Sequence, residues 1–204
     1  MAVRVKVCGV TSLEDARACV AAGVDAIGLN FWPRSVRRCD ERVAREIVTA
    51  LHGQSLFVGV FVDQSAEDIE RLVAEVGLDC VQLHGEESPT FVQRFLPHAY
   101  KALRVRGQEV LELTRSYPGK YVLLDAYVAG MPGGTGAVFD WQLAKRVALE
   151  RKLTLAGGLT PDNVAAAVSA VRPWCVDTAS GVESAPGVKD HALIRAFVER
   201  ARGA

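Results

Sequence analysis

Residues 3–11 of the chain are Val3-Arg4-Val5-Lys6-Val7-Cys8-Gly9-Val10-Thr11, a pattern typical of a β-strand that leads into a helix. Side chains alternate along a strand, so the valines of residues 3–7 lie on one face, and Arg4, Lys6 and Cys8 lie on the other. Thr11 and Glu14 then have the spacing of a capping box, which predicts that a helix follows at once. The opening of the chain therefore predicts one strand followed by one helix.

The same unit recurs along the whole sequence. Short runs of β-branched and apolar residues predict eight strands, at 3–7, 26–31, 56–62, 80–83, 99–105, 121–124, 153–155 and 174–176. The segments between them have apolar residues at helical spacing, as in Val164, Ala167, Val168 and Val171, and in Ile194, Phe197, Val198 and Ala201. Two further helix starts are indicated by Ser65 with Asp68 and by Thr160 before Pro161.

A strand followed by a helix, repeated, predicts an α/β fold with a parallel sheet. Eight repeats in 204 residues leave about 25 residues for each unit, which is close to the minimum for a βαβ crossover. We therefore expect a (β/α)8 TIM barrel and a single domain spanning residues 1–204. The alternative is an open doubly wound sheet, which normally has a glycine fingerprint after its first strand. This chain has only Gly9 there.

Composition excludes several classes of partner. Lys plus Arg number 24 and Asp plus Glu number 24, so no basic excess indicates a nucleic-acid partner. The short cluster Arg34, Arg37 and Arg38 is sufficient for one small anion. The five cysteines include no CxxC pair, which predicts neither a disulfide framework nor a zinc site and suits a reducing cytosol. No stretch approaches about 18 uncharged apolar residues, so we expect no membrane segment and a cytoplasmic location.

Chemically capable side chains fall where a barrel places its active site, at the C-terminal ends of the strands. Cys8, His84, Asp125 and Asp177 end or follow the first, fourth, sixth and eighth predicted strands. In a barrel the valines of the first strand face the helices, which turns Lys6 and Cys8 toward the interior. A buried lysine needs a carboxylate partner, and Asp177 on the neighbouring eighth strand is the candidate.

Two glycine-containing turns predict a phosphate site. Residues 156–159 and 179–182 follow the seventh and eighth strands, and the candidate phosphate-binding residues are Gly157, Gly158, Ser180 and Gly181. These two loops form the recurrent phosphate site of TIM barrels, although a double glycine also ends many strands in a plain turn. A third glycine cluster, residues 130–136, follows Asp125 directly and predicts a mobile lid, with an ordinary surface loop as the alternative.

Together these residues resemble the phosphoribosylanthranilate isomerase family. The opening Lys6-Val7-Cys8-Gly9-Val10-Thr11 and the segment Val81-Gln82-Leu83-His84-Gly85 are similar to two family motifs. Further matches occur at residues 30–37, 123–125, 133–141, 155–159 and 176–183, so the resemblance covers all eight units. One departure is Ala179, where the family often has serine. Because backbone groups hold the phosphate, we expect little consequence.

The resemblance implies an Amadori rearrangement in tryptophan biosynthesis, which converts N-(5'-phosphoribosyl)anthranilate into 1-(2-carboxyphenylamino)-1-deoxyribulose 5-phosphate. It implies that Asp125 is the general acid that opens the ribose ring and that Cys8 is the general base that removes the C2' proton. An ordinary Asp is ionised and an ordinary Cys is mostly thiol at neutral pH, so we expect burial to raise the pKa of Asp125 and a cation such as Lys6 to favour the Cys8 thiolate.

By the same resemblance, Arg37 binds the anthranilate carboxylate. His84 either lines the substrate site or caps its own loop, and we expect no catalytic role for it. Asp177 either binds a substrate hydroxyl or amine or only neutralises Lys6. The reaction moves protons alone, so we expect no cofactor and no metal. The expected partner is the small phosphoribosyl substrate, and the chain is a monomer or a homodimer.

Three rival functions are compatible with a phosphate-binding barrel. A related aminoaldose isomerase of histidine biosynthesis would have Asp where this chain has Cys8. Indole-glycerol-phosphate synthase would need extra N-terminal sequence and catalytic lysines. A non-catalytic sensor of phosphate ligands is disfavoured because Cys8 and Asp125 are both present.

Overall fold

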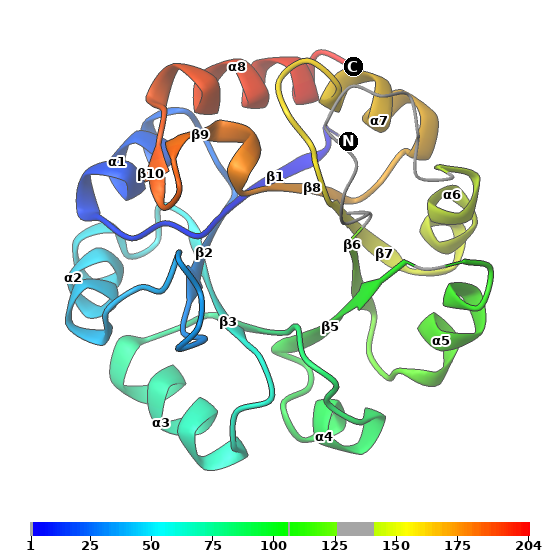
Figure 1. Cartoon of the computed structure of the whole chain (residues 1–204), viewed down its shortest axis with the longest axis horizontal. Helices are drawn as coiled ribbons and strands as arrows, with labels where there is room; N and C mark the ends of the chain where they lie inside the picture. Colours follow the sequence, from blue (N-terminus) through cyan, green and yellow to red (C-terminus); the bar gives the residue numbers. More distant parts are fainter. Residues whose placement is uncertain (1, 106, 126–140) are drawn as a thin grey trace.

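Eight parallel strands form a closed barrel in the computed structural model of the chain, which describes residues 2–105, 107–125 and 141–204 (Figure 1). The strands are β1 (Arg4–Cys8), β2 (Ala26–Asn30), β3 (Leu56–Phe61), β4 (Cys80–Leu83), β5 (Ala99–Arg104), β6 (Tyr121–Asp125), β7 (Lys152–Ala156) and β8 (Cys175–Thr178). Neighbours in sequence are neighbours in the barrel, and β8 pairs with β1 to close it. The predicted TIM barrel is confirmed.

A ring of helices surrounds the barrel (Figure 1). These are α1 (Leu13–Ala21), α2 (Glu41–Leu51), α3 (Ala66–Val76), α4 (Pro89–Arg94), α5 (Val110–Ser116), α6 (Trp141–Glu150), α7 (Val164–Val171) and α8 (His191–Arg202). The apolar stripes predicted from the sequence face inward: Val164, Ala167 and Val171 of α7 are buried, as are all four stripe residues of α8. None of the helices within the described ranges is long and apolar enough to cross a bilayer.

The helix starts correct two of the predictions. Ser65 caps α3 as expected, because its hydroxyl accepts from the amide of Asp68. Helix α1, however, is capped by Ser12, whose hydroxyl accepts from the amide of Asp15 at 3.1 Å, and Thr11 is not the cap. The hydroxyl of Thr11 donates instead to the carbonyl of Gly187 at 2.8 Å.

Thr160-Pro161 starts a turn at residues 161–163 and not α7 itself, which begins at Val164. The hydroxyl of Thr160 accepts from the amide of Asp162 at 3.2 Å, and its carbonyl accepts from the amide of Val164 at 3.1 Å. The side chain of Asn163 accounts for the delay. Its oxygen accepts from the amide of Thr160 at 2.8 Å, and its nitrogen donates to the carbonyl of Gly158 at 2.9 Å. These bonds hold the chain in a turn before the helix can begin.

Between β8 and α8 the chain forms a short excursion that the sequence did not predict. A single 3-10 turn, η1 (Ser180–Val182), leads into a two-stranded antiparallel hairpin of β9 (Glu183–Ala185) and β10 (Val188–Lys189). The hairpin lies beside α1 (Figure 1), because the amide of Lys189 and the imidazole of His191 both contact the carboxylate of Asp15. The hairpin also contacts the turn after β1, because the hydroxyl of Thr11 donates to the carbonyl of Gly187.

Candidate active site

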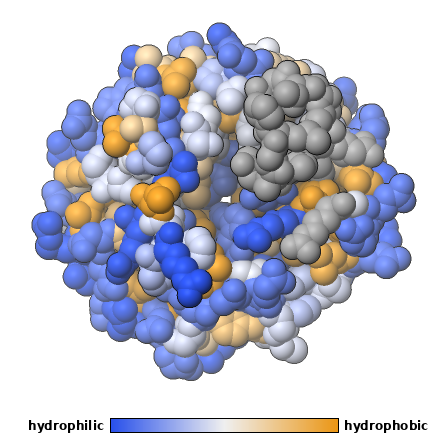
Figure 2. Space-filling view, in the orientation of Figure 1, coloured by the Kyte–Doolittle hydropathy of each residue, from blue (hydrophilic) through white to orange (hydrophobic). Residues whose placement is uncertain are grey.

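The predicted site residues lie at the C-terminal ends of the barrel strands. Cys8 is the last residue of β1, Asp125 is the last residue of β6, Asp177 lies in β8, and His84 directly follows β4. Figure 2 shows hydrophilic residues gathered around the hollow at the centre of this face. The predicted lid at residues 130–136 and the motif positions 133–140 lie outside the described residues.

Cys8 packs against β2, and Gly28 makes room for it. Cys8 pairs with Gly28 in the strand register, and a Cβ added to Gly28 would lie 2.8 Å from the sulfur of Cys8. Burial raises the pKa of the Cys8 thiol, Lys6 and Lys189 oppose that rise, and Asp177 reinforces it. The nearby cation therefore does not produce the depressed thiol pKa that we expected from the sequence, because desolvation outweighs it.

The predicted partnership of Lys6 and Asp177 is confirmed. The two residues are opposite each other in the β1–β8 register, and Nζ of Lys6 lies 2.8 Å from Oδ2 of Asp177. Their side chains are only 2% and 7% exposed. Burial alone would lower the pKa of Lys6, but Asp177 and Cys8 raise it well above its ordinary value, so Lys6 stays charged. Oδ1 of Asp177 is buried and has no hydrogen-bond partner within the described part of the chain.

A chain of buried side chains fixes His84 beside Asp125. The hydroxyl of Tyr100 donates to Oε1 of Gln82 at 2.9 Å, and Nε2 of Gln82 lies 2.9 Å from Nδ1 of His84. An amide nitrogen can only donate, so Nδ1 of His84 accepts and a neutral imidazole carries its proton on Nε2. Nε2 lies 3.5 Å from Oδ2 of Asp125. The arrangement presents an N–H group to the candidate acid.

The sequence reasoning overlooked Gln82 and Tyr100, although a signal for Gln82 was available. Period-two alternation along β4 places Gln82 on the same face as His84, and a polar residue inside a predicted buried strand calls for a partner. Tyr100 is buried on the neighbouring strand β5, which pairs with β4 at that position. Nothing in the sequence spacing alone connects Tyr100 to the site.

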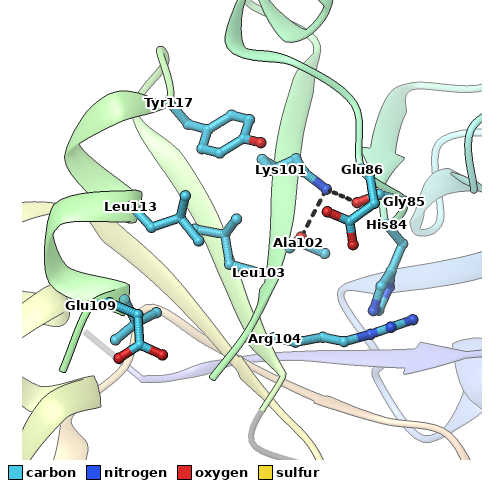
Figure 3. A pocket seen from close by; sticks show the side chains of 11 residues that line it. His84, Gly85, Glu86, Lys101, Ala102, Leu103, Arg104, Glu109, Leu113 and Tyr117 are labelled. Carbon is cyan, nitrogen blue, oxygen red and sulfur yellow. Dashed lines mark hydrogen bonds between the residues drawn. The ribbon is translucent and has the colours of Figure 1, made fainter. Parts of the chain in front are cut away.

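His84 also lines a cavity of about 290 Å³ between the ends of β4 and β5 and helix α5. Figure 3 shows Leu103 and Leu113 on one side of it, with Arg104 and His84 on the other. Arg104 is opposite Asp125 in the β5–β6 register. This pocket therefore adjoins the strand end that carries the candidate acid, and Arg104 adds a cationic side chain at that point.

Arg37 is already engaged by a carboxylate of the chain itself. Its Nε and Nη2 donate to the two oxygens of Glu183 at 2.8 and 2.7 Å, and these hydrogen bonds raise the pKa of Arg37. Nζ of Lys189 also donates to Glu183, at 2.8 Å. Burial alone would raise the pKa of Glu183, but the bonds from Arg37 and Lys189 lower it, so Glu183 is a carboxylate. Glu183 is the last residue of the matching segment 176–183, but neither its position nor its neighbours in the sequence indicate a pairing with Arg37.

The two predicted phosphate loops are in contact. Gly157 and Gly158 have positive φ angles of 97° and 65°, which glycine adopts without strain. The hydroxyl of Thr178 at the end of β8 donates to the carbonyl of Leu159 at 2.7 Å. A Cβ on Gly181 would collide with that same carbonyl, so only glycine lets the loops approach this closely. Ser180 lies beside Gly181 in η1.

Comparison with known proteins places the chain in a family. The model of the N-(5'-phosphoribosyl)anthranilate isomerase family matches residues 5–200, which is nearly the whole chain. The chain belongs to this family. The family resemblance inferred from the motifs is thereby confirmed.

Relatives in this family are similar over their full lengths. An N-(5'-phosphoribosyl)anthranilate isomerase of Pseudomonas aeruginosa strain LESB58 is 48% identical over 203 residues, covering 98% of this chain and 96% of the relative. A crystal structure of the Thermotoga maritima isomerase is 40% identical with a TM-score of 0.90, and covers 99% of this chain and 100% of that one. The Thermotoga maritima enzyme is dimeric.

One solved member of the family was crystallised with a compound related to the reaction. The phosphoribosyl anthranilate isomerase in complex with reduced 1-(o-carboxyphenylamino)-1-deoxyribulose 5-phosphate is 38% identical, with a TM-score of 0.87. The alignment covers 99% of this chain and 100% of that one.

Proposed function

We propose that the chain catalyses the Amadori rearrangement of N-(5'-phosphoribosyl)anthranilate to 1-(2-carboxyphenylamino)-1-deoxyribulose 5-phosphate, a step of tryptophan biosynthesis. The observation that carries the proposal is the placement of Cys8 and Asp125 at the C-terminal ends of β1 and β6, in a barrel of this isomerase family. The cysteine at position 8 disfavours the isomerase of histidine biosynthesis, which would have Asp there.

In this scheme Asp125 begins the reaction as a general acid. Its protonated carboxyl transfers a proton to the furanose ring oxygen, the C1'–O bond breaks, and C1' becomes part of a Schiff base with the anthranilate nitrogen. The neighbouring His84 supports this role, because its Nε2–H faces Oδ2 of Asp125 and can stabilise the carboxylate that the transfer leaves behind. His84 thus lines the site and moves no proton itself.

Cys8 then acts as the general base. Its thiolate removes the proton from C2', and the electron pair of that bond moves toward the Schiff base to form an enolamine, which converts to the ketone product. Burial holds the pKa of Cys8 high, so the thiolate is the minor form at neutral pH. Lys6 and Lys189 favour this thiolate electrostatically. The proton gained by Cys8 balances the one lost by Asp125, so no cofactor or metal is needed.

The anionic groups of the substrate have separate binding positions in the proposal. The phosphate binds at the paired loops, to backbone groups of Gly157, Gly158, Ser180 and Gly181. The anthranilate carboxylate binds Arg37. Asp177 has one oxygen paired with Lys6 and a second buried oxygen without a partner among the described residues, which fits an acceptor for a substrate hydroxyl. The oligomeric state and the cytoplasmic location stay predictions.

The test follows the loss of N-(5'-phosphoribosyl)anthranilate with time in the wild type and in the variants Cys8→Ser and Asp125→Asn. We expect rapid turnover by the wild type and loss of at least about a hundredfold in kcat for each variant, as is usual for removal of a general acid or base. Cys80→Ser is the matched control, because it removes a free, half-buried thiol at the opposite end of a barrel strand. An inactive wild type overturns the proposal, and the histidine-pathway aminoaldose is then the substrate to try.

A further inference from the structure

We propose that Glu183 is a positioning residue that orients Arg37 toward the substrate carboxylate and sets its distance from the phosphate loop. This inference deepens the proposed function and rests on it, since it assumes that Arg37 binds the carboxylate. Glu183 begins β9 in the hairpin that precedes α8. Its side chain is 5% exposed, whereas that of Arg37 is 27% exposed.

The hydrogen bonds leave one edge of Arg37 available. A guanidinium has five N–H donors, and Glu183 takes one from Nε and one from Nη2. Of the three other donors, one on Nη1 and one on Nη2 form the end-on edge of the guanidinium, and the second Nη1 donor points back toward Cδ. The end-on edge can hold a carboxylate through two parallel bonds. Because Glu183 occupies the side-on edge, which is formed by Nε and Nη2, the substrate carboxylate can bind Arg37 only at the end-on edge.

The backbone on the other side confines the stem of Arg37. A Cβ added to Gly9 would lie 2.7 Å from Cδ of Arg37, so the arginine lies close against the turn after β1. Gly9 has a positive φ of 73° and follows Cys8 directly. The guanidinium is therefore held between this turn and Glu183, next to the candidate base.

Lys189 extends the contact to the phosphate loop. Its Nζ donates to Glu183 at 2.8 Å and to the carbonyl of Ala179 at 3.0 Å. Ala179 immediately precedes Ser180 and Gly181 of the proposed phosphate site. Glu183 thus connects Arg37 through Lys189 to the loop that would hold the phosphate. This link fixes the spacing of the two anion sites and selects substrates that have both a carboxylate and a phosphate at that spacing.

If Glu183 acted only through its charge, its removal would change ligand binding in the direction opposite to that expected for a positioning residue. Glu183 neutralises part of the charge of two cations, Arg37 and Lys189. If charge alone mattered, removing the carboxylate would make the site more positive and would tighten the binding of an anionic ligand. A positioning role predicts weaker binding, and only for ligands that have the carboxylate.

The experiment measures the Kd of two probes by titration calorimetry. The first is reduced 1-(o-carboxyphenylamino)-1-deoxyribulose 5-phosphate, and the second is the same compound without the carboxylate. For Glu183→Gln we expect the Kd of the first probe to rise about tenfold, in line with a disturbed charge-assisted contact. We expect the Kd of the second to change less than about twofold. Lys189→Met keeps the pair of Glu183 with Arg37 but cuts the link to Ala179, and we expect a smaller rise for the first probe.

Two controls separate the possible failures. Glu87→Gln removes another buried carboxylate that pairs with a buried lysine, Lys101 at 3.0 Å, and its ratio of the two Kd values is expected to stay at the wild-type level. Arg37→Met tests the assumption beneath the inference. A loss of carboxylate discrimination in Arg37→Met but not in Glu183→Gln refutes the positioning role alone. Wild-type discrimination in Arg37→Met refutes the assigned role of Arg37. If Glu183→Gln does not fold, unchanged discrimination in Lys189→Met overturns the inference.

Discussion

Substitution of either member of the buried ion pair between Lys6 and Asp177 tests how much this pair stabilises the closed barrel. The two charges lie 2.8 Å apart and are almost fully buried. At an effective dielectric constant of about 20, their attraction is about 6 kcal/mol, and most of it offsets the cost of removing the ions from water. Removal of one partner leaves the other charge buried and unpaired. We therefore expect Lys6→Met and Asp177→Asn each to lower the free energy of unfolding by about 3–5 kcal/mol.

The double variant, Lys6→Met with Asp177→Asn, shows whether the single variants lose stability because they break the ion pair or because each new side chain packs poorly. With neither charge present, no ion is left unpaired, so the double variant is expected to lose at least about 2 kcal/mol less than the sum of the two single losses. Urea unfolding at pH 7, followed by tryptophan fluorescence and by far-UV circular dichroism, measures the three values. Strictly additive effects, or single losses below about 1 kcal/mol, would show that the pair contributes little to the fold, and the reasoning would be refuted.

Four further predictions concern the site. Gly28→Ala places a Cβ 2.8 Å from the sulfur of Cys8 and forces the thiol to move. We expect kcat to fall at least about tenfold and the free energy of unfolding to fall by about 1–3 kcal/mol. A folded variant with wild-type kcat contradicts this prediction. Gln82→Met removes the donor to Nδ1 of His84, which frees the imidazole to turn away from Asp125, so we expect a lower kcat. A folded variant with wild-type kcat argues against a role for Gln82 in holding His84. Burial raises the pKa of Cys8 above the ordinary thiol value of about 8.5, so alkylation of Cys8 by iodoacetamide should reach half its maximal rate above about pH 8.5, as measured by mass spectrometry. Lys6→Met removes a charge that favours the thiolate and should move this midpoint still higher. Full reactivity of Cys8 at pH 7 would contradict the prediction. Activity assayed with and without EDTA should be the same, and inhibition reversed by added metal would contradict a mechanism that moves only protons.

The strands were predictable because two independent patterns agree on them. Runs of β-branched residues give their positions, and alternation within the first run correctly places Lys6 inside the barrel. The pairing of Lys6 with Asp177 then follows from the closure of the barrel, which makes the first and eighth strands neighbours. These inferences need only local periodicity and the topology of the fold.

The cap of α1 was misassigned because adjacent residues satisfy the same pattern. Thr11 stands three residues before Glu14, and Ser12 stands three residues before Asp15, so both hydroxyls have an acidic residue at capping distance. The choice depends on a tertiary contact, since the hydroxyl of Thr11 bonds to Gly187 in the hairpin. Local sequence has no information about that partner.

The partner of Arg37 was beyond sequence reasoning for the same reason. Glu183 reaches Arg37 because residues 183–189 fold into a hairpin beside α1, and nothing in the local pattern predicts that excursion. The direction of the pKa shift of Cys8 also depends on the balance of two opposing effects. The sequence identifies the cation near the thiol, whereas the extent of burial appears only in three dimensions.

The separation in sequence of the paired residues has a consequence for folding. Lys6 and Asp177 are 171 residues apart, and Arg37 and Glu183 are 146 residues apart. Contacts between such distant residues form only after a large loss of chain entropy, and topologies dominated by them fold slowly. A partly folded chain that lacks the last unit contains neither pair, and one that lacks only the first unit has no pair of Lys6 with Asp177. During refolding, the return of catalytic activity would therefore follow closure of the ring and lag behind the return of helical content.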